Sequence, residues 1–129
     1  MYTLTLARFH PTTAAQGSTF DDPDEVIGFL GNLDDDPCYV FVAHVAGGLD
    51  HGNFNLWRNQ GRALVRLDEQ SEHAATHAAG APAGEFEFRD EDGTSFHVAG
   101  ARTVDARLGL EALRFWLRTG GKLQALDWD

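Results

Sequence analysis

Hydrophobic and polar residues alternate along much of this chain, with the two-residue period that is typical of β-strands. Where the alternation weakens, β-branched and aromatic residues form nearly continuous runs, which also favour strands. Six strands are predicted, at residues 2–9, 38–46, 53–58, 62–68, 85–89 and 94–99. The most uniformly apolar of them is 38–46, so it is predicted to be a central strand that is covered on both faces.

One stretch after the first strand carries the start and stop signals of a helix. Asp22 can cap it, Pro23 suits the first helical position, and Glu25 completes the spacing of a capping box. The helix is expected to end near Gly31, because glycine readily adopts the backbone conformation of a helix stop. Its predicted buried residues are Val26, Ile27, Leu30 and Leu33.

A second helix is predicted close to the end of the sequence, beginning at Thr103, Val104 or Asp105. Its apolar face consists of Leu110, Leu113, Trp116 and Leu117, which follow the helical period. Arg114 and Arg118 are expected on the other side, where a cation complements the helix dipole. Gly120 and Gly121 should end this helix, and 123–128 should then form a short strand.

Short turns are predicted at 34–37, 59–61 and 90–93, and three longer segments connect other elements. Residues 10–19 are predicted to be a polar loop and 46–52 a glycine-rich turn. The weakly periodic segment 69–84 fits either a loop or one more short strand. The predicted fold is therefore α+β, a single domain over 1–129. It has a mainly antiparallel sheet of about six strands with two helices packed on it, the first after strand 1 and the second before a C-terminal strand.

Charge is the compositional feature that bears most on function. The 129 residues hold 20 acidic and 10 basic side chains, a net charge of −10, and 43% are hydrophobic. Residues 1–57 carry eight carboxylates against Arg8 alone. Such a surface repels nucleic acid and anionic membranes, and it attracts a basic partner. Plain solubility is the alternative explanation.

The sequence favours a cytoplasmic protein without a membrane segment. No apolar run approaches the roughly 20 residues that span a bilayer, and the first residues lack the layout of a signal peptide. Cys38 is the only cysteine, so it cannot form an internal disulfide, and it is expected to be a small buried residue that opens a strand.

A search for catalytic and metal-binding patterns does not indicate an enzyme. The nucleophile-elbow, phosphate-loop and dinucleotide-loop motifs are absent from the sequence. Asp50-His51 resembles the acid–histidine pair of a general base, but no nucleophile can be assigned to it. His73 and His77 would have metal-ligand spacing on a helix, although no third ligand is evident. Turn residues and surface histidines are the alternatives, and no metal or cofactor is predicted.

A third pattern combines carboxylates with aromatic residues and is typical of an interface for a basic partner. The aromatic anchor would be Trp57, which falls on the more polar side of its predicted strand. The predicted partner-binding residues are Asp34, Asp35, Asp36, Asp50, Trp57, Glu85, Glu87, Asp90, Glu91 and Asp92. Solvated turns and a core tryptophan are the alternative interpretation of the same residues.

The segment 111–128 resembles the carboxy-terminal signature of the Imm1 family, which comprises bacterial immunity proteins of polymorphic toxin systems. In that signature a helix ends in a Thr-Gly-Gly phrase, and a strand that ends on tryptophan follows. The matching positions are Phe115, Leu117, Thr119, Gly120, Gly121 and Trp128. The departures are Trp116 inside the helix and Leu123 where proline is usual. Residues 22–30 are similar to the first helix of the family.

The resemblance implies a non-enzymatic inhibitor that binds a cognate toxin domain and blocks its active site. Some members of the family are paired with deaminase-fold or nuclease toxins, whose nucleic-acid clefts are basic, and an acidic chain suits such a partner. Two alternatives stay open. One is a small enzyme or ligand-binding domain that uses Asp50 and His51 or His73 and His77. The other is a structural or regulatory subunit whose partner is not a toxin.

Overall fold

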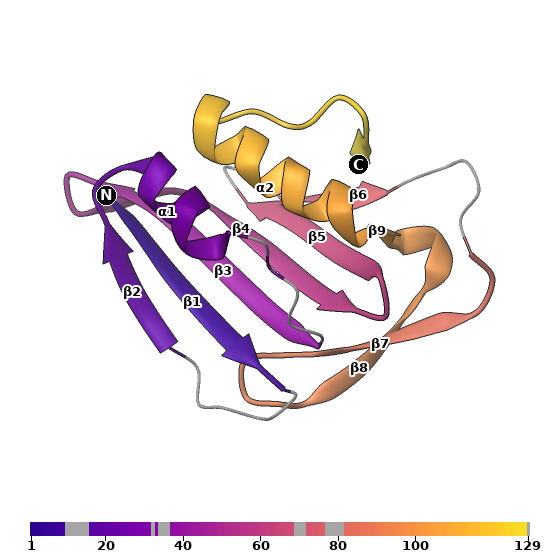
Figure 1. The fold of residues 1–129 in the computed structure, drawn as a ribbon. Helices are drawn as coiled ribbons and strands as arrows, with labels where there is room; N and C mark the ends of the chain where they lie inside the picture. The colour runs from indigo at the N-terminus through magenta and orange to yellow at the C-terminus, as the bar shows by residue number, and fades with distance from the viewer. Residues whose placement is uncertain (10–15, 32, 34–36, 69–71, 77–81, 129) are drawn as a thin grey trace.

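In the computed structural model, a large antiparallel sheet carries two helices on one face and a separate β-hairpin on the other (Figure 1). The structure describes residues 1–9, 16–31, 33, 37–68, 72–76 and 82–128, with the backbone alone at 16, 50 and 72–76. Strands β1 to β5 are Tyr2–Arg8, Gln16–Phe20, Cys38–Ala46, Leu49–Asn59 and Arg62–Asp68. Strands β6 to β10 are Glu72–Thr76, Glu85–Arg89, Ser95–Ala99, Val104–Asp105 and Asp127–Trp128. The helices are α1 (Pro23–Leu30), α2 (Ala106–Thr119) and a short 3₁₀ turn, η1 (Gly100–Arg102).

The large sheet has the strand order β10-β6-β5-β4-β3-β1-β2 within the described residues, and β9 pairs with β5. Its central strands are joined by tight hairpins. Gly47 and Gly48, between β3 and β4, and Gln60 and Gly61, between β4 and β5, all have positive φ. Two consecutive residues of positive φ give the turn whose twist matches that of the strands on either side. These turns hold β3, β4 and β5 in register as a continuous meander.

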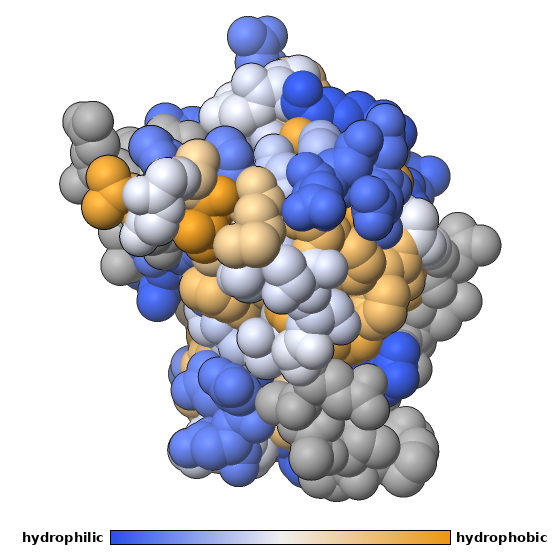
Figure 2. All heavy atoms as spheres, turned by 90° about the vertical axis from the view of Figure 1, so that its left-hand side faces the viewer, coloured by the Kyte–Doolittle hydropathy of each residue, from blue (hydrophilic) through white to orange (hydrophobic). Residues whose placement is uncertain are grey.

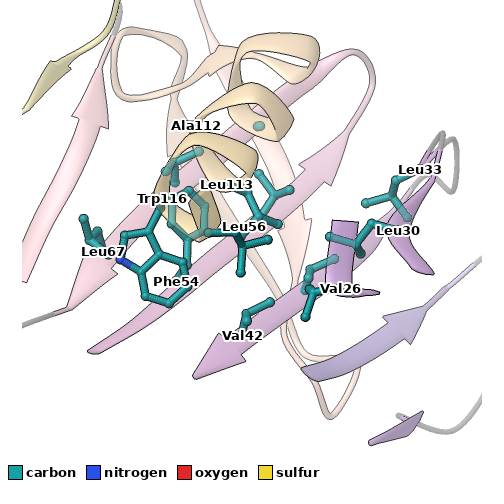
Figure 3. Close-up of a cluster of buried hydrophobic side chains, with 14 of the residues drawn as sticks. Val26, Leu30, Leu33, Val42, Phe54, Leu56, Leu67, Ala112, Leu113 and Trp116 are labelled. Carbon is teal, nitrogen blue, oxygen red and sulfur yellow. The ribbon is translucent and has the colours of Figure 1, made fainter. Parts of the chain in front are cut away.

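The main hydrophobic core lies between the sheet and the two helices (Figure 3). Phe54 and Leu56 of β4 point toward Leu113 and Trp116 of α2, and the rings of Phe54 and Trp116 are 5.8 Å apart. Val26 and Leu30 of α1 complete the layer and are buried. Both helices thus cover one face of the sheet with the apolar faces that the sequence predicts.

Close contact between α2 and the sheet depends on Gly109. A Cβ atom at this position would lie 2.8 Å from the Cβ of Ala63 and 3.1 Å from a methyl carbon of Leu56. Real Cβ atoms do not approach another carbon so closely, so any larger residue would push the helix away from β4 and β5. Gly109 lowers the helix propensity of α2, but it permits the close packing of the helix on the sheet.

The two helices also contact each other through a polar bond. The Nη2 atom of Arg114 donates to the carbonyl oxygen of Gly31, 2.8 Å away, at the end of α1. A cation at the carboxyl end of a helix complements both its dipole and an otherwise unpaired carbonyl. Arg114 is therefore partly buried and belongs to the helix–helix contact.

A second, aromatic core lies on the opposite face of the sheet, under the hairpin of β7 and β8. Its buried members are Ala7, Phe9, Tyr39, Trp57 and Phe88. Because successive side chains of a strand point to opposite faces, Tyr39 and Val40, although adjacent, belong to different cores. The sheet is thus covered on both faces, and β3 is buried over most of its length, as predicted.

Most of the local predictions are confirmed. Helix α1 begins after Asp22, whose carboxylate accepts from the backbone N–H of Asp24 at 2.8 Å. Helix α2 follows Asp105 and ends at Gly120, which has φ 74°. Cys38 is buried at the start of β3. The α+β fold, a mainly antiparallel sheet with two helices, is the predicted one.

Four expectations about the topology are wrong. Part of the predicted loop 10–19 is strand β2, so α1 follows the second strand and not the first. The hairpin of β7 and β8 forms its own two-stranded sheet and does not extend the main one. The predicted turn 46–52 is only two residues long between β3 and β4. The last strand is also shorter than expected, since only Asp127–Trp128 pair with β6. These differences arise from pairing between distant segments, which local patterns do not specify.

Candidate functional site

The hairpin of β7 and β8, residues 85–99, presents the largest group of described carboxylates that the sequence predicts for an interface. We call it the acidic hairpin. Its five carboxylates are Glu85, Glu87, Asp90, Glu91 and Asp92. Its only lysine or arginine is Arg89. All except Glu87 are exposed, and Glu87 lies 3.7 Å from both Arg89 and His97. The hairpin is therefore a strongly negative part of the surface.

Trp57 fastens this hairpin to the main sheet. Its indole N–H donates to the Asp90 carboxylate at 3.0 Å, and its ring stacks on Tyr39 at 5.0 Å between centroids. The ring of Phe96, from β8, meets Trp57 edge-on at 6.0 Å. A further bond runs from the side-chain amide of Asn59 to the carbonyl of Glu87 at 2.8 Å. These contacts hold the hairpin backbone and the Asp90 carboxylate in place on the sheet, which lowers the conformational entropy that a partner must remove on binding.

The tip of the hairpin is a tight turn stabilised by a backbone hydrogen bond and by the Asp92 carboxylate. The backbone N–H of Gly93 donates to the Asp90 carbonyl at 2.9 Å, and Gly93 has φ 84°. The backbone N–H of Thr94 donates to the Asp92 carboxylate at 2.9 Å. Hydrogen bonds from the Thr94 backbone and side chain lower the pKa of Asp92, since they stabilise its charged form. Asp92 thus stays ionised as part of the turn.

An open hollow beside the tip is lined by Tyr39, Asp90, Glu91 and Asp92. Burial raises the pKa of Tyr39 to about 12, and the neighbouring charges of Glu91 and Asp90 add to the effect. The Tyr39 hydroxyl donates to the side-chain carbonyl of Asn55 at 2.6 Å. The hollow therefore combines a neutral phenol with three carboxylates, which suits a cationic group of a partner.

The structure places the predicted partner-binding residues in three different situations. Glu85, Glu87, Asp90, Glu91 and Asp92 lie together on the acidic hairpin. Trp57 is only 6% exposed, so it is a core residue that supports the surface, as in the alternative interpretation. Asp50 lies at the start of β4, where its backbone pairs with Val45. Asp34, Asp35 and Asp36 lie outside the described residues.

The structure places the described histidines of the two predicted patterns on strands. His51 lies in β4 and not in a turn, with its Nε2 atom 3.2 Å from the Ala46 carbonyl and its ring 5.8 Å from that of His44. His44 in turn stacks on Tyr2 at 4.7 Å. His73 lies in strand β6 and not on a helix, and His77 is outside the described residues. Among the residues that the structure describes, no three His, Cys, Asp or Glu side chains are grouped as metal ligands would be.

Tyr39 and Asn55 are the residues of this site that sequence reasoning missed. Both lie in strands predicted correctly, and both fall on the face of the sheet that carries Trp57. The hydrogen bond between Tyr39 and Asn55 depends on the register of β3 and β4. This register places Tyr39 directly opposite Trp57, two residues from Asn55 on the same face. Alternation within each strand could have placed each on a face, but it could not have brought them together.

Comparisons with known proteins do not extend this picture. No protein-family model matches the chain, and no curated protein matches it closely enough to indicate a family. In the part of the chain that the structure describes, neither helix is both long and apolar enough to cross a membrane.

Proposed function

We propose that this protein is a cytoplasmic immunity protein that binds a cognate toxin domain and blocks its active-site cleft. The observation that carries the proposal is the acidic hairpin with its five carboxylates, which lies over a packed aromatic core and is bonded to Trp57 through the Asp90 carboxylate and to Asn59 through the Glu87 carbonyl. A negative hairpin that is packed on the sheet in this way is suited to a basic cleft that normally accepts nucleic acid. The sequence resemblance of 111–128 to the Imm1 family supports the same function independently.

The charge of the whole chain favours this partner over others. A net charge of −10 steers a basic protein toward the surface and speeds association, whereas it repels nucleic acid itself. The side chains of the hairpin do not resemble a catalytic group. Tyr39, which lines the hollow beside the hairpin, has a raised pKa, so little of the basic phenolate is present at neutral pH, and Asp92 is engaged in the turn. Binding without chemistry is the function that this arrangement supports best.

The test uses the toxin domain encoded by the gene adjacent to that of this protein. The purified pair should form a complex, and co-expression of this chain should protect cells from the toxin. The double substitution Glu85→Lys and Glu91→Lys should slow association on the order of tenfold at low salt, because it reverses two exposed charges at the interface. Asp127→Lys with Glu111→Lys changes the net charge equally but lies outside the hairpin, on β10 and α2.

Rate constants at several salt concentrations separate the possibilities. The hairpin variant should lose both rate and salt dependence, while the control variant should lose much less of either. Equal losses in the two variants would show that net charge acts without a local interface. If the wild-type chain neither binds the toxin domain nor protects cells, the proposed function is wrong.

A further inference from the structure

Strand β2 forms an open edge of the main sheet. Within the described residues it pairs with β1 alone, and the chain then leaves the sheet to form α1 on the helix face. Natural proteins usually protect such an edge with lysine, proline, a bulge or a covering element. The sequence of β2, Gln-Gly-Ser-Thr-Phe, has no charged residue and no proline. This edge, which no described strand covers, is therefore competent to pair with a further strand.

The register shows which backbone groups face outward. The backbone N–H of Val45 donates to the carbonyl of Met1 at 2.8 Å, so Met1 is turned toward β3. In an antiparallel sheet alternate residues turn their backbone groups to opposite sides, which directs Tyr2 and Leu4 toward β2. Their partners in β2 are Phe20 and Ser18, and these face back toward β1. The N–H and C=O groups of Gly17 and Thr19 therefore point to the open edge.

The surroundings of this edge combine apolar and acidic groups. Phe29 of α1 is 46% exposed and lies 5.5 Å from the ring of Phe20, at one end of β2. Four exposed carboxylates adjoin the same end, on Asp21, Asp22, Asp24 and Glu25. The tip of the acidic hairpin approaches the other side of the sheet near the end of β1, where a Cβ atom on Gly93 would lie 4.0 Å from the Phe9 ring. Figure 2 views the molecule from this side and shows hydrophobic surface between hydrophilic groups.

We infer that β2 accepts an extended, basic segment of the toxin domain as an additional strand, an inference that rests on the proposed function. Backbone hydrogen bonds to Gly17 and Thr19 would supply affinity, and an apolar side chain of the segment would cover Phe29. Lysine or arginine side chains would meet the carboxylates at the start of α1. Charge favours a basic segment over a second copy of this chain, because each copy has a net charge of −10 and two copies would repel each other.

Proline substitutions test the edge without removing its pairing with β1. Gly17→Pro and Thr19→Pro each remove an outward N–H group, and proline is tolerated where a strand's N–H faces solvent. The matched controls are Gly17→Ala and Thr19→Val, which keep the N–H group. An added Cβ at Gly17 would meet only the Leu4 carbonyl at 4.0 Å, which is an ordinary contact. Thermal unfolding of each variant establishes that it folds like the wild type.

The double proline variant should bind the toxin domain on the order of tenfold more weakly or worse, because two ladder hydrogen bonds are lost. The Ala and Val controls should bind like the wild type. Phe29→Lys provides a second measurement that leaves β2 intact, and it too should weaken binding, because it replaces an apolar contact with a charge that repels the basic segment. Amide hydrogen exchange at Gly17 and Thr19 should slow in the complex.

The outcomes separate this inference from the proposed function. If the toxin domain binds the wild type, the proline variant and Phe29→Lys equally, the strand-addition site is wrong while the immunity function stands. If the wild type does not bind the toxin domain, the proposed function fails and this inference fails with it. If sedimentation of the isolated chain shows a dimer that the proline variant abolishes, β2 is a contact between copies and the inference is also wrong.

Discussion

The indole N–H of Trp57, in the central sheet, donates to the Asp90 carboxylate at the tip of the hairpin, 3.0 Å away and 33 residues further along the chain. The bond joins the aromatic core to the proposed binding surface. One partner is a core residue, only 6% exposed, whereas the other is an exposed carboxylate. The bond therefore links the stability of the fold to the proposed binding surface, which makes it the first place to test.

Trp57→Phe should keep an aromatic ring against Tyr39 and Phe96 but remove the donor to Asp90. We expect the free energy of unfolding to fall by about 1–3 kcal/mol, since a bond to a charged group and some ring volume are lost. Amide exchange in 85–99 should become faster than in β3. The matched variant Asp90→Asn keeps a side-chain oxygen as acceptor, so it should cost less. Unchanged protection of the hairpin in Trp57→Phe would contradict the anchoring role.

Gly109→Ala should destabilise the fold even though alanine is the better helix former. The new methyl group would lie 2.8 Å from the Cβ of Ala63, and the cost of separating α2 from the sheet, about 1–3 kcal/mol, exceeds the gain in propensity. Gly28→Ala is the matched control in α1, where an added Cβ meets nothing within 4 Å. It should stabilise by about 0.5–1 kcal/mol. Urea denaturation of both variants decides between packing and propensity.

The raised pKa of Tyr39 predicts that stability falls at high pH. Its folded-state value is about 12 against the ordinary 10.0, so between these pH values the unfolded chain loses the phenol proton first. The free energy of unfolding should decrease across this window by up to roughly 2–3 kcal/mol, at 1.36 kcal/mol per pKa unit. The contribution is fully present below pH 10. Tyrosinate absorbance of the folded protein should show one late transition, which Tyr39→Phe removes.

The two tryptophans of the final segment should differ in their effect on stability. Trp116 is 5% exposed and packs on Phe54, so truncation to alanine should cost about 3–5 kcal/mol. Trp128 is only partly buried, at the edge strand β10, and donates to the Leu123 carbonyl at 2.9 Å. Its truncation should cost less, about 1–3 kcal/mol. Equal losses in thermal or urea unfolding would show that β10 is as tightly packed as α2.

Much of the candidate site could be predicted from the sequence because its parts are local. The alternation of Phe86 and Phe88 predicts one apolar face of β7, and Asp90 to Gly93 predicts the turn. What alternation cannot specify is the surface that the apolar face covers. In the structure the apolar face of β7 packs on the aromatic side of the main sheet, against Trp57 and Tyr39, and β7 does not join the main sheet as a further strand.

Strand β2 is an element that the local sequence pattern does not predict. Its residues are polar and lack an alternating apolar pattern, so the sequence predicts a loop. The backbone of β1 nevertheless has hydrogen-bonding groups on its outer side, and Gln16–Phe20 satisfies them. Gln16–Phe20 therefore forms a strand because it pairs with β1, and not because of its own sequence pattern.

The sequence by itself determines where helices start and stop, which strands alternate and where the chain turns, since each depends on a few adjacent residues. Asp22, Gly120 and the pair Gln60-Gly61 act in this way. Only the tertiary structure decides which faces meet, because packing joins residues that are far apart in the chain. It makes Trp57 a buried support and the acidic hairpin the exposed surface, and it leaves β2 as the open edge.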